Sequence, residues 1–183
     1  MKKLILIALL LLAAVPAAPA RAETGPLILL IAGNNVNNAF HVSLSPDGRS
    51  YSILSTLALE VGGSICSHPE QVPTELECTA TAIAGFEVNT GGGSDSVVFS
   101  SDIPVPVTVR GGGGNDRLSG GSAADKLIGG PGDDRLMGRR GDDWIEGGPG
   151  HDRLMGGQGN DQLRGGPDED KLIGGPGNNT LLP

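Results

Sequence analysis

Carboxylates recur at a fixed interval through the C-terminal part of this chain. Between residues 111 and 182 an acidic or amide side chain, nearly always aspartate, stands at every ninth position, and a glycine precedes it by five residues each time. Glycine lets a backbone turn sharply without a Cβ clash, so carbonyl oxygens can converge on one point. Carboxylates beside such carbonyls supply hard oxygen ligands, of which Ca²⁺ takes about six to eight. The spacing therefore predicts cation binding.

Eight contiguous nine-residue units make up this stretch. They read GGGGNDRLS, GGSAADKLI, GGPGDDRLM, GRRGDDWIE, GGPGHDRLM, GGQGNDQLR, GGPDEDKLI and GGPGNNTLL. Position one is always Gly, position six is Asp except for Asn179 in the last unit, and position eight is always Leu or Ile. The pattern resembles the RTX, or haemolysin-type, calcium-binding repeat GGxGxDxUx. A flexible Gly-rich linker is the alternative, but a linker has no reason to place Leu or Ile at every ninth residue.

The resemblance implies an all-β fold, a right-handed parallel β-roll in which calcium ions lie between stacked turns. Each unit divides into a six-residue turn and a three-residue strand, in which side chains alternate between faces. Position eight is then expected to point inward, and the mostly cationic position seven to point outward. Without calcium we expect this segment to stay unfolded, because stacked carboxylates repel one another and the apolar positions are few.

Two units complete one coil, so turns two units apart stack on the same side. The expected calcium pairs are Asp116 with Asp134, Asp125 with Asp143, Asp134 with Asp152, Asp143 with Asp161, Asp152 with Asp170 and, more weakly, Asp161 with Asn179. The residues expected to contribute carboxylate or carbonyl ligands are Asp95, Gly111, Gly113, Asp116, Gly120, Asp125, Gly129, Asp134, Asp143, Gly147, Asp152, Gly156, Asp161 and Asp170. Ala123, Arg139 and Asp168 replace turn glycines and are expected to strain their turns.

Residues 23–110 are predicted to form a β-rich cap for the roll of residues 111–183. Candidate strands are 27–31, 40–44, 51–54, 76–80, 86–88, 96–99 and 105–109. Residues 90–98 already resemble one repeat, with Asp95 at position six, and an enlarged half-turn would bring Asp95 to the same side as Asp116. A repeat array needs such a cap, since an open end exposes apolar side chains and strand edges. A separate β-sandwich is the alternative.

The first 22 residues have the features of an export signal. Lys2 and Lys3 precede a short apolar run, and Ala20-Arg21-Ala22 supplies a small-x-small cleavage pattern. A retained membrane anchor is the alternative, but the run is shorter than the ~20 residues that a spanning helix needs. Export favours a disulfide between Cys66 and Cys78 over a metal or redox role. Cleavage would remove three cations and change the formal net charge from −8 to −11.

The net charge of the chain and the motifs that it lacks exclude several classes of function. An acidic chain without a basic cluster argues against nucleic acid as a partner. The chain has neither HExxH nor GxSxG, so no catalysis is expected, and no long apolar helices are present for membrane insertion. We therefore expect a secreted, extracellular calcium-binding protein, with Ca²⁺ as its only cofactor. The alternative is a calcium-stabilised cell-surface or matrix adhesion component, whose partner the sequence does not identify.

Overall fold

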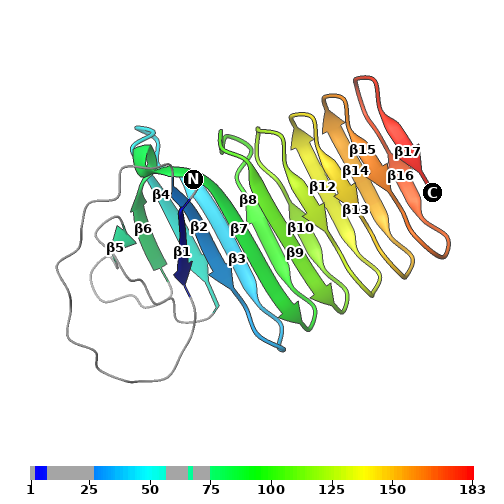
Figure 1. Ribbon diagram of the computed structural model, residues 1–183, viewed down its shortest axis with the longest axis horizontal. Helices are drawn as coiled ribbons and strands as arrows, with labels where there is room; N and C mark the ends of the chain where they lie inside the picture. The colour runs from blue at the N-terminus through cyan, green and yellow to red at the C-terminus, as the bar shows by residue number, and fades with distance from the viewer. Residues whose placement is uncertain (1–2, 8–26, 57–65, 68–74) are drawn as a thin grey trace.

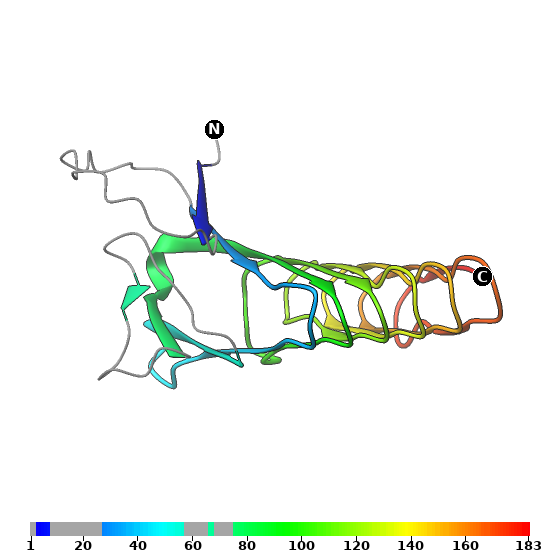
Figure 2. The ribbon, with the colours of Figure 1, turned by 90° about the horizontal axis from the view of Figure 1, so that it is seen from below.

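The computed structural model describes residues 3–7, 27–56, 66–67 and 75–183, and these residues form an all-β fold. Strands that alternate between two sheets wind into a parallel β-solenoid of about five turns, and a mixed sheet region precedes it. In Figure 1 the solenoid strands lie side by side in chain order as far as β17. Figure 2 shows them from below as two layers joined by short turns. The predicted fold class, an all-β parallel β-roll, is confirmed.

Two sheets, A and B, contain all of these strands. Sheet A has the order β1 (Lys3–Ile7), β2 (Leu27–Ala32), β7 (Ile83–Gly92), β9 (Val107–Gly113), β11 (Lys126–Ile128), β13 (Trp144–Glu146), β15 (Gln162–Arg164) and β17 (Thr180–Leu182). Sheet B has the order β16 (Lys171–Ile173), β14 (Arg153–Gln158), β12 (Arg135–Arg140), β10 (Arg117–Ser119), β8 (Ser96–Phe99), β3 (Ala39–Leu44), β4 (Ser50–Ser55), β6 (Glu75–Thr79) and β5 (Cys66–Ser67). A single 3₁₀ turn, η1 (Ala80–Ala82), lies between β6 and β7.

The register of the repeats follows from two units per coil. Within each sheet the repeat strands are parallel, and each residue faces the one eighteen positions later, as Leu118 faces Leu136 and Leu127 faces Ile145. Side-chain alternation then puts position eight inside the roll. Six of these residues are buried, namely Leu118, Leu127, Leu136, Ile145, Leu154 and Leu163. Burial is incomplete in the last coil, where Leu172 is half-buried against the core and Leu181 is 43% exposed, because β16 and β17 are the terminal strands of their sheets and no further coil covers them.

The segment before the repeats is built into the same two sheets. Strand β2 pairs in parallel with β7, and β3 pairs in parallel with β8, so both sheets continue across residue 110. Beyond β3, sheet B becomes antiparallel through β4, β6 and β5. Aromatic rings fill this end of the core, with Tyr51 edge-on to Phe86 at 5.1 Å between centroids and Phe86 at 5.3 Å from Phe99. One hydrophobic core therefore runs from this aromatic end into the repeats.

Glycine-rich ends account for the largest differences between predicted and observed strands. Residues 96–99 are predicted as a strand and form β8, but β7 and β9 both extend beyond their predicted ends. Gly91 and Gly92 lie beyond the predicted strand 86–88, yet they pair in register with Gly112 and Gly113. Backbone pairing does not require a side chain, so glycine residues can extend a strand although their composition does not indicate one. Short β5 is absent from the predicted strands.

Two predictions concern residues that the structure describes only in part. Residues 3–7 of the predicted export signal form β1 and pair in parallel with β2, and the rest of the signal lies outside the described residues. Cys66 and Cys78 are register partners on the antiparallel strands β5 and β6, which is the placement that a disulfide requires. Signal and disulfide both stay predictions. Among the described residues, no helix has the length and hydropathy needed to cross a bilayer.

Candidate metal centre

The position-six side chains stack into two columns, one along each side of the roll. The first column contains Asp95, Asp116, Asp134, Asp152 and Asp170, and the second contains Asp125, Asp143, Asp161 and Asn179. Each backbone N–H donates to Oδ1 of the next member of its column, for example Asp116 N to Asp134 Oδ1 at 2.7 Å and Asp125 N to Asp143 Oδ1 at 2.8 Å. The stacking predicted for all six pairs, and for Asp95 with Asp116, is confirmed.

The second carboxylate oxygen of these aspartates has no protein partner. Within the described residues, Oδ2 is buried without a hydrogen bond in seven aspartates, namely Asp95, Asp116, Asp134, Asp143, Asp152, Asp161 and Asp170. A buried charged oxygen that lacks a partner is costly, and a cation is the group that compensates it best. These orphaned oxygens are therefore the atoms in the structure that fit Ca²⁺.

The glycine at position one makes room for that oxygen. A Cβ on Gly129 would overlap Oδ2 of Asp134, and the same overlap recurs at Gly138 with Asp143 and through the other units. The turn glycines do not all share one backbone conformation, and those at position one do not have a positive φ. Positive φ falls instead on positions two and four, as at Gly130 (φ +116°) and Gly132 (φ +144°). Position one is glycine because the carboxylate occupies the space of a side chain.

The carbonyls predicted as ligands lie at the same turns. Gly129 O accepts a hydrogen bond from Gly112 N at 2.8 Å, and Gly147 O accepts one from Gly130 N at 2.8 Å. Gly113 O accepts from Gly93 N at 2.8 Å, and Gly111 O accepts from the Thr90 hydroxyl at 2.7 Å. A carbonyl oxygen has two lone pairs, so each of these keeps one for a further partner.

Burial raises the pKa of most of these carboxyl groups. It raises the pKa of Asp134 and of Asp143 to about 7, and neighbouring aspartates of the same column contribute to both shifts. Burial likewise raises the pKa of Asp116, Asp125 and Asp152 to about 6. Without a cation, Asp134 and Asp143 therefore still hold protons near pH 7, where ordinary aspartates with a pKa of 3.8 have already lost theirs.

Asp125 differs from the other aspartates. Its Oδ2 accepts a hydrogen bond from Gly121 N at 2.6 Å, and its Oδ1 accepts one from Val107 N at 2.9 Å. The Arg139 guanidinium lies near enough to favour the charged carboxylate and donates a hydrogen bond to the carbonyl of Phe99. Val107 stands where the preceding member of the column would be, so this end of the second column has no second carboxylate. Protein groups alone therefore satisfy both oxygens of Asp125.

Two of the three expected departures from turn geometry are confirmed. Arg139 and Asp168 replace glycines and both have φ +85°, a left-handed backbone that non-glycine residues adopt at a cost. Ala123 is not in this region, so the strain predicted for its turn is wrong. That turn adopts another shape, in which Ser122 N and Oγ both donate to Ile103 O, each at 2.9 Å.

A second ladder, outside the first, is not among the features predicted from the sequence. At position five, Asp133 N donates to Asn115 Oδ1 and His151 N to Asp133 Oδ1, each at 3.0 Å. On the other side, Asn160 N donates to Asp142 Oδ1 at 2.7 Å. These residues are exposed, but they also tie adjacent turns together. The spacing of eighteen residues between these polar side chains could have predicted this ladder from the sequence.

The donor set excludes a site made of side chains alone. No group of three or more His, Cys, Asp or Glu side chains suitable for a metal occurs in the described part of the chain. Each step of a column brings together two carboxylates at most, so the remaining ligands must be carbonyl oxygens or water. This mixture suits a hard cation and does not suit zinc.

Comparison with known families agrees with the geometry. Residues 110–145, 128–163 and 146–181 each match the sequence model of the RTX calcium-binding nonapeptide repeat, which spans four copies. Successive matches are offset by eighteen residues, which is one full coil of the roll. A search of the curated proteins and a search of the solved structures found no significant match. No catalytic family is found.

Proposed function

From the RTX calcium-binding nonapeptide repeats that residues 110–181 carry, we propose that the chain is a secreted, non-enzymatic calcium-binding protein whose repeats fold as Ca²⁺ binds between the stacked turns. The observation that supports this most directly is the alignment of buried Oδ2 atoms that lack any hydrogen-bond partner. These atoms recur at every coil, so one type of site is repeated along each side of the roll.

Aspartate carboxylates and turn carbonyls are the proposed ligands. The carboxylates are those of Asp95, Asp116, Asp134, Asp143, Asp152, Asp161 and Asp170, with Asp125 as the weakest candidate because its oxygens already have partners. The carbonyls are those of Gly111, Gly113, Gly120, Gly129, Gly147 and Gly156. Bound calcium would supply positive charge to the columns. The residues of the chain would act only as ligands, which the fold holds in place.

Calcium concentration would then control folding. Calcium is scarce in the cytosol and abundant outside the cell, and extracellular modules bind it at about 10⁻⁴–10⁻³ M. The repeats would stay unfolded and exportable inside and would fold outside. The predicted signal at residues 1–22 and a disulfide between Cys66 and Cys78 belong to the same proposal. A disulfide that closes a loop of this size stabilises a fold by roughly 3 kcal/mol on the chain-entropy model.

Circular dichroism of the mature chain during a calcium titration tests this proposal. We expect β-structure to appear cooperatively at millimolar calcium and to disappear when a chelator is added. Titration calorimetry on the same sample gives the number of ions bound. Complete β-structure in chelator, with no heat of calcium binding, would contradict the proposal.

A second candidate function is a surface or matrix adhesion component that calcium merely stabilises. It is favoured by the row of exposed cations along sheet B that is described below. Cell fractionation with and without chelator separates the two functions. A soluble product is expected from the first, and a surface-attached product that chelator releases is expected from the second.

A further inference from the structure

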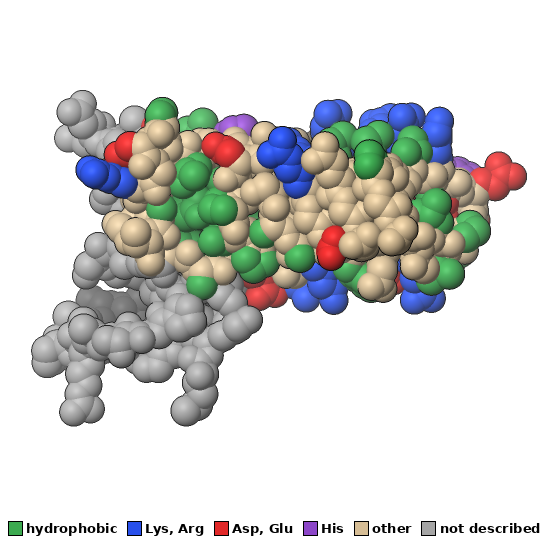
Figure 3. All heavy atoms as spheres, turned by 90° about the horizontal axis from the view of Figure 1, so that it is seen from above, with side chains coloured by type: hydrophobic (Ala, Val, Ile, Leu, Met, Phe, Trp, Pro, Cys, Tyr) green, Lys and Arg blue, Asp and Glu red, His purple; other side chains and the backbone are tan. Residues whose placement is uncertain are grey.

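An uninterrupted row of cations runs along the outer face of sheet B. Position seven of alternate units supplies Arg117, Arg135, Arg153 and Lys171, which we call the cationic row. Register pairing places these four residues directly beside one another on β10, β12, β14 and β16. Parallel strands lie ~4.8 Å apart, so the row spans roughly 14 Å. In Figure 3, Lys and Arg side chains gather along both long edges of the roll, the cationic row being one part of them.

No acidic side chain in the described part of the chain forms an ion pair with this row. All four residues are exposed, and among the described residues the ion pairs are Arg49 with Asp47 and Arg110 with Glu87, both elsewhere. The full chain carries a net charge of −8, so a local concentration of unpaired cations runs against the overall charge. At about 0.1 M salt, charges more than about 10 Å apart are largely screened, so the charges that act on a ligand at the row are those of the row and of the adjacent aspartate column, which bound calcium would offset.

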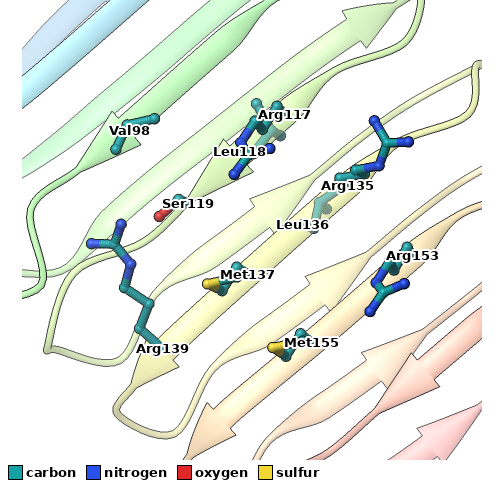
Figure 4. A pocket seen from close by; sticks show the side chains of 10 residues that line it. All are labelled: Val98, Arg117, Leu118, Ser119, Arg135, Leu136, Met137, Arg139, Arg153 and Met155. Atoms are coloured by element: carbon teal, nitrogen blue, oxygen red, sulfur yellow. The ribbon is translucent and has the colours of Figure 1, made fainter.

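An apolar row lies beside the cationic row. Position nine supplies Met137, Met155 and Ile173, and Val98 on β8 extends the same line. Figure 4 shows Arg117, Arg135 and Arg153 in one line, with Val98, Ser119, Met137 and Met155 in a second line next to it. The two rows border a shallow hollow of about 350 Å³. The buried Ser119 hydroxyl in this hollow has no hydrogen-bond partner.

We propose that these two rows bind a linear anionic polysaccharide, with its acidic groups on the cationic row and its sugar rings on the apolar row. An extended chain of acidic sugars presents its charges at regular intervals along a line, which matches cations that repeat once per strand. Apolar C–H faces of sugar rings pack on thioether and aliphatic side chains such as Met137 and Met155. The inference rests on the folded, calcium-binding roll of the proposed function.

Other polyanions fit the surface less well. Single-stranded nucleic acid binds through aromatic side chains that stack on its bases, and neither row contains one. Trp144 lies on β13 in the other sheet, where Lys126 Nζ is 4.3 Å from its ring centroid. A membrane surface needs apolar side chains that insert, but Met155 and Ile173 are half-buried and Met137 is only 37% exposed. The four cations of the row also form a single line, with the half-buried Arg139 across the hollow from it, and a line of charges suits a chain better than a plane.

Binding of labelled chondroitin sulfate fragments to the calcium-loaded mature chain tests the proposal. This polymer carries carboxylate and sulfate groups and stays soluble with calcium. We expect affinity to rise with fragment length until about four acidic groups are spanned, and to fall at high salt. The triple variant Arg117→Gln, Arg135→Gln, Arg153→Gln should bind at least about tenfold more weakly. Neutral dextran should not bind.

A matched variant separates the row from general charge. Arg49→Gln, Lys126→Gln, Arg164→Gln removes the same charge from the β3–β4 turn and from sheet A, and it should bind within about twofold of the unchanged chain. Equal weakening in both variants would overturn the proposal, as would absence of binding by the unchanged chain. Tighter binding to phosphatidylglycerol vesicles or to single-stranded DNA through the same three arginines would overturn it as well, by assigning the row to another partner.

Calcium titration of every variant distinguishes failure of this inference from failure of the proposed function. A chain that folds with calcium and ignores the polysaccharide contradicts the inference alone. A chain that neither binds calcium nor folds contradicts the proposed function first.

Discussion

The two oxygens of each position-six carboxylate have separate roles. Oδ1 accepts the backbone N–H of the preceding column member and fixes the register of the coil. Oδ2 points into a buried space that glycine at position one leaves open, and it has no partner there. The first role needs only an acceptor, which Asn179 also provides to Asp161 N at 2.8 Å. The second role needs a negative charge, so only aspartate performs both.

Asp143→Asn separates these roles. The amide keeps an acceptor for Asp125 N, but it removes the charge from a buried carboxylate whose pKa burial raises to about 7. We expect at least about a tenfold loss of calcium affinity at this site, equivalent to about 1.4 kcal/mol. In chelator at pH 8 the same variant should retain more β-structure than the unchanged chain, since its folding buries one charge fewer. Calorimetry measures the loss of calcium affinity, and circular dichroism in chelator measures the gain in β-structure.

Asp142→Asn is the matched control for this prediction. Asp142 is exposed, lies next to Asp143 and accepts from Asn160 N, a bond that an amide also makes. Calcium affinity and stability should both stay close to those of the unchanged chain. Equal losses in the two variants would show that charge near the turn, and not the buried Oδ2, governs binding.

At the scale of the element, the repeat turns other than that of residues 120–125 combine two backbone requirements that glycine meets. Positions two and four supply the positive φ that reverses the chain, and position one supplies empty space for the carboxylate. The sequence alone could not separate these uses, because both appear as the same letter. Only the packing of Asp134 against Gly129 shows that position one is constrained by a neighbour and not by its own backbone.

Gly129→Ala tests the space-filling role. The new Cβ would overlap Asp134 Oδ2 and approach Gly147 O, so the carboxylate must move out of its column. We expect a loss of about 2–4 kcal/mol in the free energy of unfolding at saturating calcium, together with weaker calcium binding. Gly113→Ala is the control, because a Cβ there meets no atom within 4 Å. If both variants unfold at the same temperature, the overlap does not matter.

How far the elements could be predicted depends on their periodicity. The repeat strands, the stacking of Asp116 on Asp134 and the inward position eight all follow from a period of nine. The N-terminal half has no period, so its strands were located but not their partners. Asp125 is satisfied by Gly121 N, through an irregular turn, and by Val107 N, which lies before the repeats, and the period of nine encodes neither contact. The residues of the cationic row could be read from the sequence, but their pattern predicted only that position seven points outward. It did not predict that the cations of alternate units lie side by side on one sheet.

At the scale of the whole molecule, the stability of the roll depends on proton and calcium concentration together. Each column concentrates negative charge in a narrow, buried line. Protons and calcium ions are the two species that can neutralise it, and they compete for the same oxygens. Stability therefore has opposite pH dependence with and without calcium.

This competition gives a prediction for the calcium-free chain. The pKa of Asp134 and Asp143 rises from 3.8 to about 7 in the folded state, so folding takes up protons. Their contribution to stability is complete below pH ~4 and is lost as the pH rises through about 7. We expect more β-structure in dialysed, calcium-free protein at pH 5 than at pH 8, by circular dichroism. At saturating calcium the order should reverse. Calcium-free stability that increases from pH 5 to pH 8 would contradict the role of the buried carboxyl groups.

Because two units make one coil, odd-numbered and even-numbered units lie in different sheets. Removal of a single nine-residue unit would send every later strand to the opposite sheet, and Arg153 and Lys171 would leave the line that Arg117 begins. The packing of the interior would be preserved, because every unit carries Leu or Ile at position eight. A protein of this kind can shorten or lengthen by any number of units without harm to its inside, but only even steps preserve the pattern on its outside.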